Sequence, residues 1–240
     1  MNMNRSLTFA SILCFASVAL AQQNADALKQ RVLSQAQNSS ADDYAFTRTI
    51  RSEQSQGGKT EKKVTVERFD PTKPADARWT LVSVDGAPPS ADTLNTFRKE
   101  VAKRRIVPGY HRIANYFGAP ATASTDSRGR TVFRFASLPK GSVTVLDTDV
   151  SESCSAEALL GDANGTPFVE QMHFTVKPMR LKLVMKLQKY ETTAHYRMGP
   201  DGKPQLVEST SELSGSGMGQ EGTMRTTTTY SDYRAAGAQR

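Results

Sequence analysis

The sequence predicts an α+β protein in which one long antiparallel sheet of about ten strands is covered by two or three helices. Three observations lead to this fold class. Apolar residues alternate with polar ones at the period of two typical of strands, and turn dipeptides such as Gly57-Gly58, Asn164-Gly165 and Asp201-Gly202 separate these runs. Two longer segments instead repeat their apolar residues at helical spacing. An antiparallel sheet with one apolar face must bury that face, so the helices are expected to pack across it.

The N-terminus predicts export from the cytoplasm. Arg5 precedes an apolar core from about Leu7 to Leu20, and Ala19-Leu20-Ala21 has the small-x-small pattern of a cleavage site. We interpret residues 1–21 as a signal peptide cleaved after Ala21, and we expect a periplasmic protein. A retained membrane anchor is the weaker alternative, because the apolar run is shorter than the roughly 20 residues that span a bilayer.

Length and charge limit the organisation and the partners of the mature chain. Residues 22–240 have a length that suits one β-rich domain. The whole chain carries a formal net charge of +7, and among its charged residues the signal peptide removes only Arg5. Such a surface attracts anionic lipid headgroups or an acidic protein partner, whereas nucleic acid is not expected outside the cytoplasm. The alternative is that the charge only keeps the protein soluble.

The cysteine content predicts a domain without an internal disulfide. Cys14 leaves with the signal peptide, so Cys154 is the one cysteine of the mature chain. We interpret it as a partly buried residue of the core. Pairing between two chains and a role as nucleophile are the alternatives.

The two helical segments differ in length and charge. Between Gln22 and Gln37, apolar residues recur at steps of three and four and form one narrow stripe. In the stretch Arg78–Arg105, a short apolar strand and the turn Asp85-Gly86 precede a helix whose apolar stripe contains Leu94, Phe97 and Val101. A further turn of helix is expected between Tyr110 and Phe117.

Several strand predictions in the second half of the chain depend on local irregularities. Val143 to Val150 reads as one strand, and Glu170 interrupts an apolar face, which predicts a bulge or a rim position. Leu181 to Leu187 reads as one strand, although its leucine, lysine and methionine content leaves a helix possible. After Lys189 the apolar positions change parity, which predicts a bulge or corner. Ser214 to Gly222 reads as a glycine-rich loop.

The motifs give little support for catalysis. Gly217 to Gly222 fits G-x-G-x-x-G, but the threonine-rich run after it predicts a strand, whereas a dinucleotide turn requires a helix. The three histidines are too far apart in the sequence to predict a metal site. No G-x-S-x-G elbow is present. We therefore expect neither a cofactor nor an enzyme, and a dyad of Cys154 with a histidine is a remote alternative.

The apolar sheet face and the helices together predict a ligand cavity. If the sheet is curved and loosely covered, the space between the layers can hold an acyl chain. Each buried methylene contributes about 0.8 kcal/mol, so binding requires no polar motif. The residues predicted to line the cavity are Trp79, Leu81, Leu94, Phe97, Val101, Phe133, Phe135, Phe168, Met172 and Phe174. The residues predicted to contact a membrane or a protein partner are Lys99, Lys103, Arg104 and Arg105.

The order of the elements resembles the periplasmic lipoprotein carriers and their outer-membrane receptors, the LolA/LolB-like family. The resemblance covers most of Ala25 to Tyr233 and includes the helix insertion Asp85–Arg105, Thr166-Pro167-Phe168 and Thr229-Tyr230. It implies an unclosed half-barrel with helices as a lid and acyl chains of a lipid or lipoprotein in the hollow. The functional arginine of the family is not matched to a position in this sequence.

Three functional hypotheses follow from these expectations. The first is a non-catalytic periplasmic carrier or binding protein for a lipid, an acyl chain or a lipoprotein. The second is a protein-binding sensor or envelope assembly factor that uses the basic helix Arg98–Arg105 as its contact surface. The third is an enzyme that uses Cys154.

Overall fold

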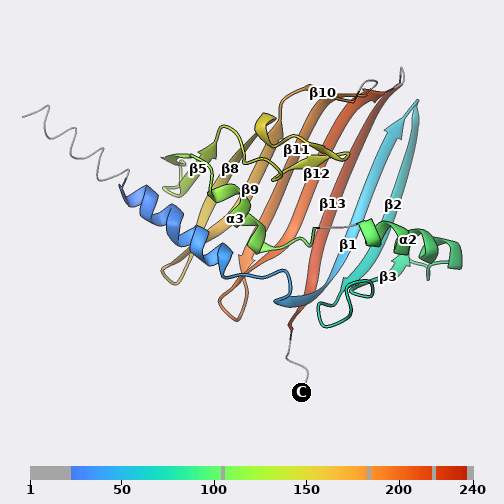
Figure 1. The fold of residues 1–240 in the computed structure, drawn as a ribbon, viewed down its shortest axis with the longest axis horizontal. Coiled ribbons are helices and arrows are strands. Elements are labelled where there is room, and N and C mark those ends of the chain that lie inside the picture. Colours follow the sequence, from blue (N-terminus) through green and yellow to red (C-terminus); the bar gives the residue numbers. More distant parts are fainter. Residues whose placement is uncertain (1–22, 104–105, 183–184, 218–219, 237–240) are drawn as a thin grey trace, which may run out of the picture.

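An antiparallel sheet of eleven strands organises the described part of the computed structural model, which comprises residues 23–103, 106–182, 185–217 and 220–236 (Figure 1). The strand order is β3-β2-β1-β13-β12-β11-β9-β8-β5-β4, and β10 pairs with β11 beside this path. The strands are β1 (Tyr44–Gln56), β2 (Lys59–Phe69), β3 (Trp79–Val84), β4 (Thr122–Thr125), β5 (Thr131–Phe135), β8 (Cys154–Ala163), β9 (Thr166–Val176), β10 (Met179–Lys182), β11 (Met185–Met198), β12 (Pro204–Gly217) and β13 (Gln220–Ala235). The first strand therefore pairs with the last, as the third and fourth strands of this order.

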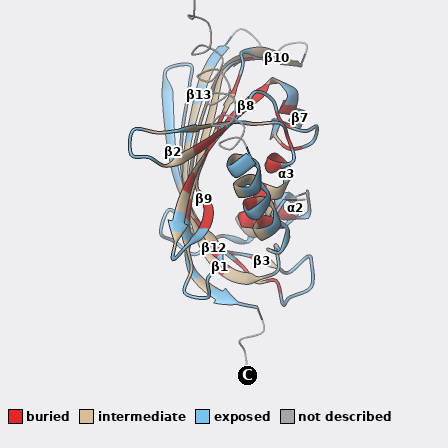
Figure 2. Ribbon diagram, turned by 90° about the vertical axis from the view of Figure 1, so that its left-hand side faces the viewer, coloured by how far each residue is buried: buried red, intermediate tan, exposed pale blue. Residues whose placement is uncertain are grey.

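The helices lie on one side of this sheet, which we call the inner face (Figure 2). They are the N-terminal helix (residues 23–37), α2 (Ala91–Lys103), the 3₁₀ helix η1 (Tyr110–Ile113), α3 (Ala114–Phe117) and the 3₁₀ helix η2 (Ser151–Ser153). Strands β3 and β4 end the path and do not pair with each other, so the sheet is not closed. The predicted fold class, an α+β unclosed half-barrel covered by helices, is confirmed.

The main hydrophobic core lies between the N-terminal helix, η1, α3 and strands β5, β8, β9 and β11. Val32 on the helix, Ile113 in η1, and Phe133 and Met172 on the sheet are all within 1% of complete burial. The Tyr110 hydroxyl fixes these layers, because it donates to Gln35 Oε1 at 2.9 Å and accepts from the Val169 backbone N–H at 3.0 Å. Burial raises the pKa of Tyr110, so the phenol stays protonated.

A smaller core also lies on the inner face, under α2, at the β1–β3 end of the strand order. Phe46 of β1, Phe69 of β2 and Trp79 of β3 stack next to one another, and Val101 of α2 packs onto them. Of the predicted stripe on α2, Val101 is buried, whereas Leu94 and Phe97 are half-buried. Helix α2 is therefore attached to the sheet by few side chains.

Two predicted irregularities are confirmed by the register of the strands. Gln171 pairs with Leu159 and Val169 pairs with Leu160, so Glu170 is the extra residue of a bulge. Its carboxylate lies 3.2 Å from the Arg130 guanidinium. A second register shift follows Leu187 in β11, where the apolar positions change parity as expected.

Three strand predictions require correction. Val143–Val150 is not one strand of the main sheet: it folds into a separate hairpin of β6 (Thr144–Val145) and β7 (Thr148–Asp149), because Leu146 and Asp147 turn the chain with φ of 48° and 65°. Leu181–Leu187 is divided between β10 and β11, which are antiparallel neighbours, so the run folds back on itself. The predicted loop Ser214–Gly222 mostly continues β12 and β13, in which glycines take part in strand pairing.

Among the described residues, no helix has the length and apolar character required to cross a membrane. Residues 1–21, the predicted signal peptide, lie outside the described residues, so its cleavage stays a prediction.

Candidate ligand cavity at the rim of the inner face

Two rows of paired residues lead across the inner face toward one rim of the sheet. In the first row, Gln54 of β1 pairs with Met224 of β13, which pairs with Leu213 of β12. In the second row, closer to the rim, Gly222 pairs with Gly215, and Gly215 pairs with Leu187. Leu187 is 1% exposed and belongs to the main core, so these rows lie on the helix-covered side.

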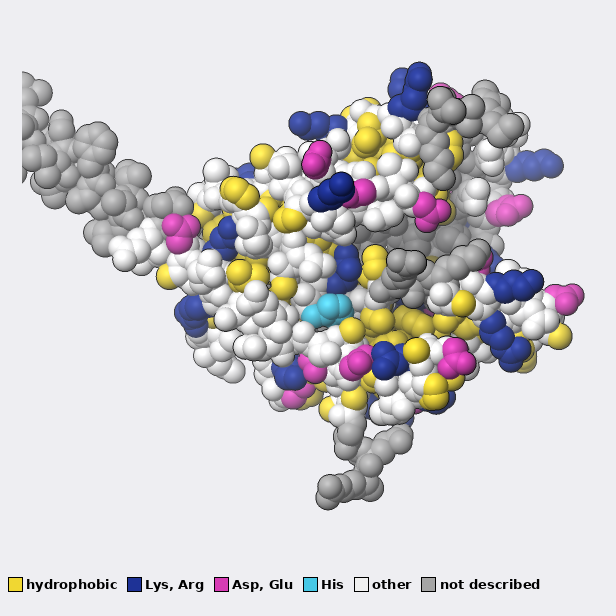
Figure 3. Space-filling model, in the orientation of Figure 1, with side chains coloured by type: hydrophobic (Ala, Val, Ile, Leu, Met, Phe, Trp, Pro, Cys, Tyr) yellow, Lys and Arg dark blue, Asp and Glu magenta, His cyan; other side chains and the backbone are white. Residues whose placement is uncertain are grey.

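A cavity of about 250 Å³, which we call the rim cavity, lies over these rows. Most of its exposed wall is apolar, and its apolar side chains come from five separate segments of the chain. Its lining residues are Gln54, Ser55, Gln56, Leu146, Leu181, Met185, Lys186, Leu187, Leu213, Gly215, Ser216, Gly217, Gln220, Gly222, Thr223 and Met224. In Figure 3, hydrophobic side chains appear at the upper edge of the molecule, with Lys and Arg side chains around them. The rim cavity can therefore receive an apolar group from outside.

Two adjacent strands carry glycine where the rows continue, at Gly215 of β12 and Gly222 of β13. A side chain on Gly215 would be placed with its Cβ 2.5 Å from the Lys186 carbonyl oxygen, so this position requires glycine. A Cβ on Gly222 would meet its nearest neighbour, the Ser55 carbonyl oxygen, at 3.5 Å, which is an ordinary contact. The wall around the glycines includes Met185 and Met224, whose unbranched side chains adapt to differently shaped guests.

The β6–β7 hairpin contributes one residue, Leu146, to the wall of the rim cavity. Val145 and Val150 anchor the hairpin in the main core, with 3% and 2% exposure. The carboxylate of Asp149 accepts hydrogen bonds from the Gly141 backbone N–H and the Ser151 hydroxyl, at 2.9 and 2.5 Å, and these bonds lower the pKa of Asp149. The turn between the two strands then leaves Leu146 44% exposed at the cavity.

A buried ion pair lies on the inner face at the side of α2. Arg48 donates from Nε and Nη2 to Glu67 Oε2 at 3.0 and 2.6 Å, and its guanidinium lies 4.0 Å from the ring centroid of Trp79. The side chains of Arg48 and Glu67 are 13% and 3% exposed. Because two charges at this depth are stable only when they are paired, this arrangement fixes β1, β2 and β3 against each other.

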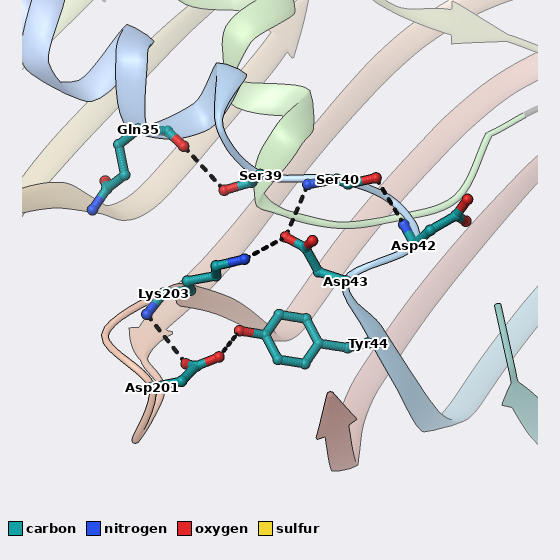
Figure 4. Close-up of polar contacts among 8 residues, drawn as sticks. All are labelled: Gln35, Ser39, Ser40, Asp42, Asp43, Tyr44, Asp201 and Lys203. Atoms are coloured by element: carbon teal, nitrogen blue, oxygen red, sulfur yellow. Dashed lines mark hydrogen bonds and ion pairs between the residues drawn. The ribbon is translucent and has the colours of Figure 1, made fainter. Parts of the chain in front are cut away.

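A polar cluster closes the end of the inner face opposite the rim cavity (Figure 4). Lys203, in the turn between β11 and β12, places its Nζ 3.2 Å from the carboxylate of Asp43. The Tyr44 hydroxyl donates to Asp201 in the same turn. Asp43 Oδ2 also accepts from the Ser40 backbone N–H at 2.9 Å. These bonds tie the segment after the N-terminal helix to the β11–β12 turn.

Seven of the ten residues predicted to line a cavity are buried in the two cores, and Leu94 is half-buried on α2. Phe133, Phe135, Phe168, Met172 and Phe174 lie in the main core, and Trp79 and Val101 lie in the smaller one. Leu81 and Phe97 line a cavity of about 460 Å³ between α2 and strands β2 and β3, and Phe168 lines one of about 470 Å³ beside the N-terminal helix. None of the ten predicted residues is among the described residues that line the rim cavity.

The lining residues of the rim cavity were therefore missed as site residues. The parity change after Lys189 and the glycines between Ser214 and Gly222 marked the correct region of the sequence. From the sequence alone these features predict a local irregularity and a loop, and they do not connect with the alternating run Leu181–Leu187. Only the pairing of β10 through β13 brings these segments together.

Cys154 and His173, two of the residues considered for catalysis or metal binding, lie within strands β8 and β9. Cys154 is completely buried, and burial raises its pKa to about 11, so the reactive thiolate is suppressed. His173 lies between two threonine hydroxyls, 2.9 Å from Thr193 Oγ1 and 3.2 Å from Thr175 Oγ1. Within the described ranges, no three His, Cys, Asp or Glu side chains are placed to hold a metal ion.

The predicted contact surface on α2 is described only in part. Lys99 is exposed to solvent. The side chain of Lys103 and both Arg104 and Arg105 lie outside the described residues. Arg98, next to Lys99, is also exposed, so the described part of α2 presents two cations to solvent.

Together, these features define an open, helix-covered sheet with an apolar cavity at one rim. The sequence matches no protein-family model and no curated protein.

Similar solved structures include three low-identity matches that span most of both chains. A LolA superfamily protein from Nitrosomonas europaea is 10% identical, covers 87% of this chain and 92% of its own, and has a TM-score of 0.37. A DUF1329 family protein from Desulfovibrio piger is 11% identical, covers 90% and 94%, and has a TM-score of 0.37. An outer membrane lipoprotein-sorting protein domain from Vibrio parahaemolyticus is 12% identical, covers 88% and 95%, and has a TM-score of 0.34.

The first and third of these names belong to the kind of protein that the sequence resembles. At TM-scores below 0.5 the matches carry no inference about ligand or activity.

Proposed function

We propose that this protein is a non-catalytic binding or carrier protein of the periplasm, and that it holds an acyl chain of a lipid or lipoprotein in the rim cavity. The observation that supports this function is a mostly apolar cavity of about 250 Å³ that opens at the edge of the sheet. Leu146, 44% exposed at this cavity, is an apolar surface that a guest chain would cover.

The volume of the rim cavity limits the free energy that burial of an acyl chain can contribute to binding. At roughly 30 Å³ per non-hydrogen atom, the volume of a water molecule in the liquid, the cavity holds about eight chain carbons. At about 0.8 kcal/mol per methylene these contribute about 6 kcal/mol before the cost of association is subtracted, so contacts of the headgroup are expected to add to the affinity.

Native mass spectrometry of gently purified protein and titration with the fluorescent probe N-phenyl-1-naphthylamine test this proposal. Met224→Trp fills the rim cavity from β13. We expect this variant to lose the lipid adduct and to weaken probe binding at least tenfold. Thr227→Trp, three residues later on the opposite face of β13, is the matched control and should bind as the wild type does. An apo mass for the wild type, together with unchanged probe binding by Met224→Trp, would contradict the proposed function.

A second candidate function is a protein-binding sensor or assembly factor, and the exposure of α2 favours it. This helix reaches the sheet mainly through Phe97 and Val101, while Arg98 and Lys99 are exposed. Charge reversal of Lys99 and Lys103 should then remove a partner from a pull-down and leave probe binding unchanged. Retention of every partner would argue against this candidate.

A further inference from the structure

A second, polar cavity adjoins the rim cavity. Its volume is about 410 Å³, and its lining residues are Gln54, Gln56, Gly57, Lys59, Glu61 and Gln220. Three of these, the glutamines, also line the rim cavity. Gln56 Nε2 donates to Gln220 Oε1 at 3.1 Å, so a pair of amides stands at the boundary between the two spaces. The residues that line the polar cavity are exposed to solvent, so the apolar rim cavity and an open polar hollow meet at shared side chains.

The polar cavity carries one charge of each sign. In the β1–β2 hairpin, Lys59 pairs with Gln56 and Glu61 pairs with Gln54, so the ammonium and the carboxylate lie on the same inner face as the glutamines. The ion pair of Glu53 with Lys62, at 3.3 Å in the same hairpin, occupies the alternate strand positions and faces the opposite side. The polar cavity therefore has no net charge and many hydrogen-bonding groups.

We propose that the natural ligand is a single-chain amphiphile whose headgroup forms hydrogen bonds and carries no net charge. This inference rests on the proposed function, because the acyl chain occupies the rim cavity while the headgroup lies in the polar cavity. An anionic headgroup would meet the Glu61 carboxylate, and a cationic headgroup would meet the Lys59 ammonium. A zwitterionic or polyhydroxylated headgroup is compatible with both charges and with the three amides.

Calorimetric titration with four dodecyl compounds, each below its micelle concentration, tests this inference. Dodecyl maltoside and dodecylphosphocholine have headgroups without net charge, dodecanoate is anionic and dodecyltrimethylammonium is cationic. We expect the first two to bind at least fivefold more tightly than either charged compound. If all four bind equally, or a charged compound binds most tightly, the inference about the headgroup is overturned while the proposed function stands. If none of the four binds, the proposed function fails as well.

Charge-reversal variants connect this selectivity to the polar cavity. Glu61→Lys should raise the affinity for dodecanoate about threefold to fivefold relative to dodecyl maltoside, the size of effect expected for exposed charges. Lys59→Glu should do the same for dodecyltrimethylammonium. Glu53→Lys, on the opposite face of the same hairpin, is the matched control and should leave the selectivity unchanged. An equal shift in Glu61→Lys and Glu53→Lys would show that net charge, not the polar cavity, selects the headgroup, and would overturn the inference.

Discussion

Removing one partner of the Arg48–Glu67 ion pair should destabilise the protein strongly. Glu67→Gln removes the charge that faces a guanidinium that is 13% exposed, and Arg48→Met removes this guanidinium from a carboxylate that is 3% exposed. Breaking a buried pair in this way costs about 3 kcal/mol or more, because the remaining charge is still desolvated. Arg48→Met also loses the contact of the guanidinium with the Trp79 ring at 4.0 Å, which adds about 1 kcal/mol.

The size of the effect can be measured by thermal and urea unfolding. A loss of 3 kcal/mol corresponds to a decrease in Tm of roughly 6 to 12 °C for a domain of this size. Trp79 is the one tryptophan of the chain, so intrinsic fluorescence reports on the environment of the ion pair during unfolding. The double variant Arg48→Met/Glu67→Leu removes both charges, and we expect it to lose less than 2 kcal/mol.

The pH dependence provides a separate check of the same reasoning. In Arg48→Met, loss of the guanidinium should raise the pKa of Glu67 in the folded state relative to the wild type. The folded variant then binds a proton at a higher pH than the folded wild type does, so the stability of the variant should decrease less than that of the wild type as the pH falls. Additive losses in the double variant, or the same pH dependence in Arg48→Met and the wild type, would refute the role of the pair as a coupled buried unit.

The remaining predictions concern two further features of the fold. Gly215→Ala should destabilise the protein by about 1 to 3 kcal/mol, because the new Cβ would lie 2.5 Å from the Lys186 carbonyl oxygen. Gly222→Ala should be close to neutral. Equal losses of stability for the two variants in urea unfolding would contradict the predicted backbone contact. Cys154 should resist alkylation by iodoacetamide at pH 8 until the protein unfolds, and rapid modification of the folded protein would contradict its burial. Burial raises the pKa of Cys154 in the folded protein to about 11, from an ordinary 9.0. The free energy of unfolding should therefore decrease as the pH rises from 9 to 11, and it should decrease less in Cys154→Ala.

The sequence predicts the fold class well because the relevant signals are local. Alternation and turn dipeptides are properties of a few neighbouring residues, and the two bulges, at Glu170 and after Leu187, left visible breaks in the alternation. The three corrections arise where a short run folds back on itself. Nothing in Val143–Val150 separates a straight strand from a hairpin until the turn at Leu146 and Asp147 is seen.

The site was less predictable because it depends on pairing between distant strands. Large apolar side chains such as those of Phe133 and Phe135 predict a cavity wall. Their size and apolar character equally favour packing into a closed core, where each is 1% exposed. The rim cavity instead lies where glycine meets glycine across β12 and β13, at Gly215 and Gly222. The sequence does not show that these two glycines are neighbours, because their pairing depends on the register of β12 and β13.

The pairing of β1 with β13 has a consequence for folding. Twelve pairs of residues join these two strands, with Tyr44 opposite Ala235 near the beginning and the end of the chain. The β1–β3 segment can form a meander early in synthesis, but it remains separated from the rest of the sheet until the final strand emerges. The closure of such a long loop is slow. Until it is complete, the unpaired edge of β1 is exposed to other chains. A truncation that removes β13 would therefore leave two sheets with newly exposed edges, a state prone to aggregation.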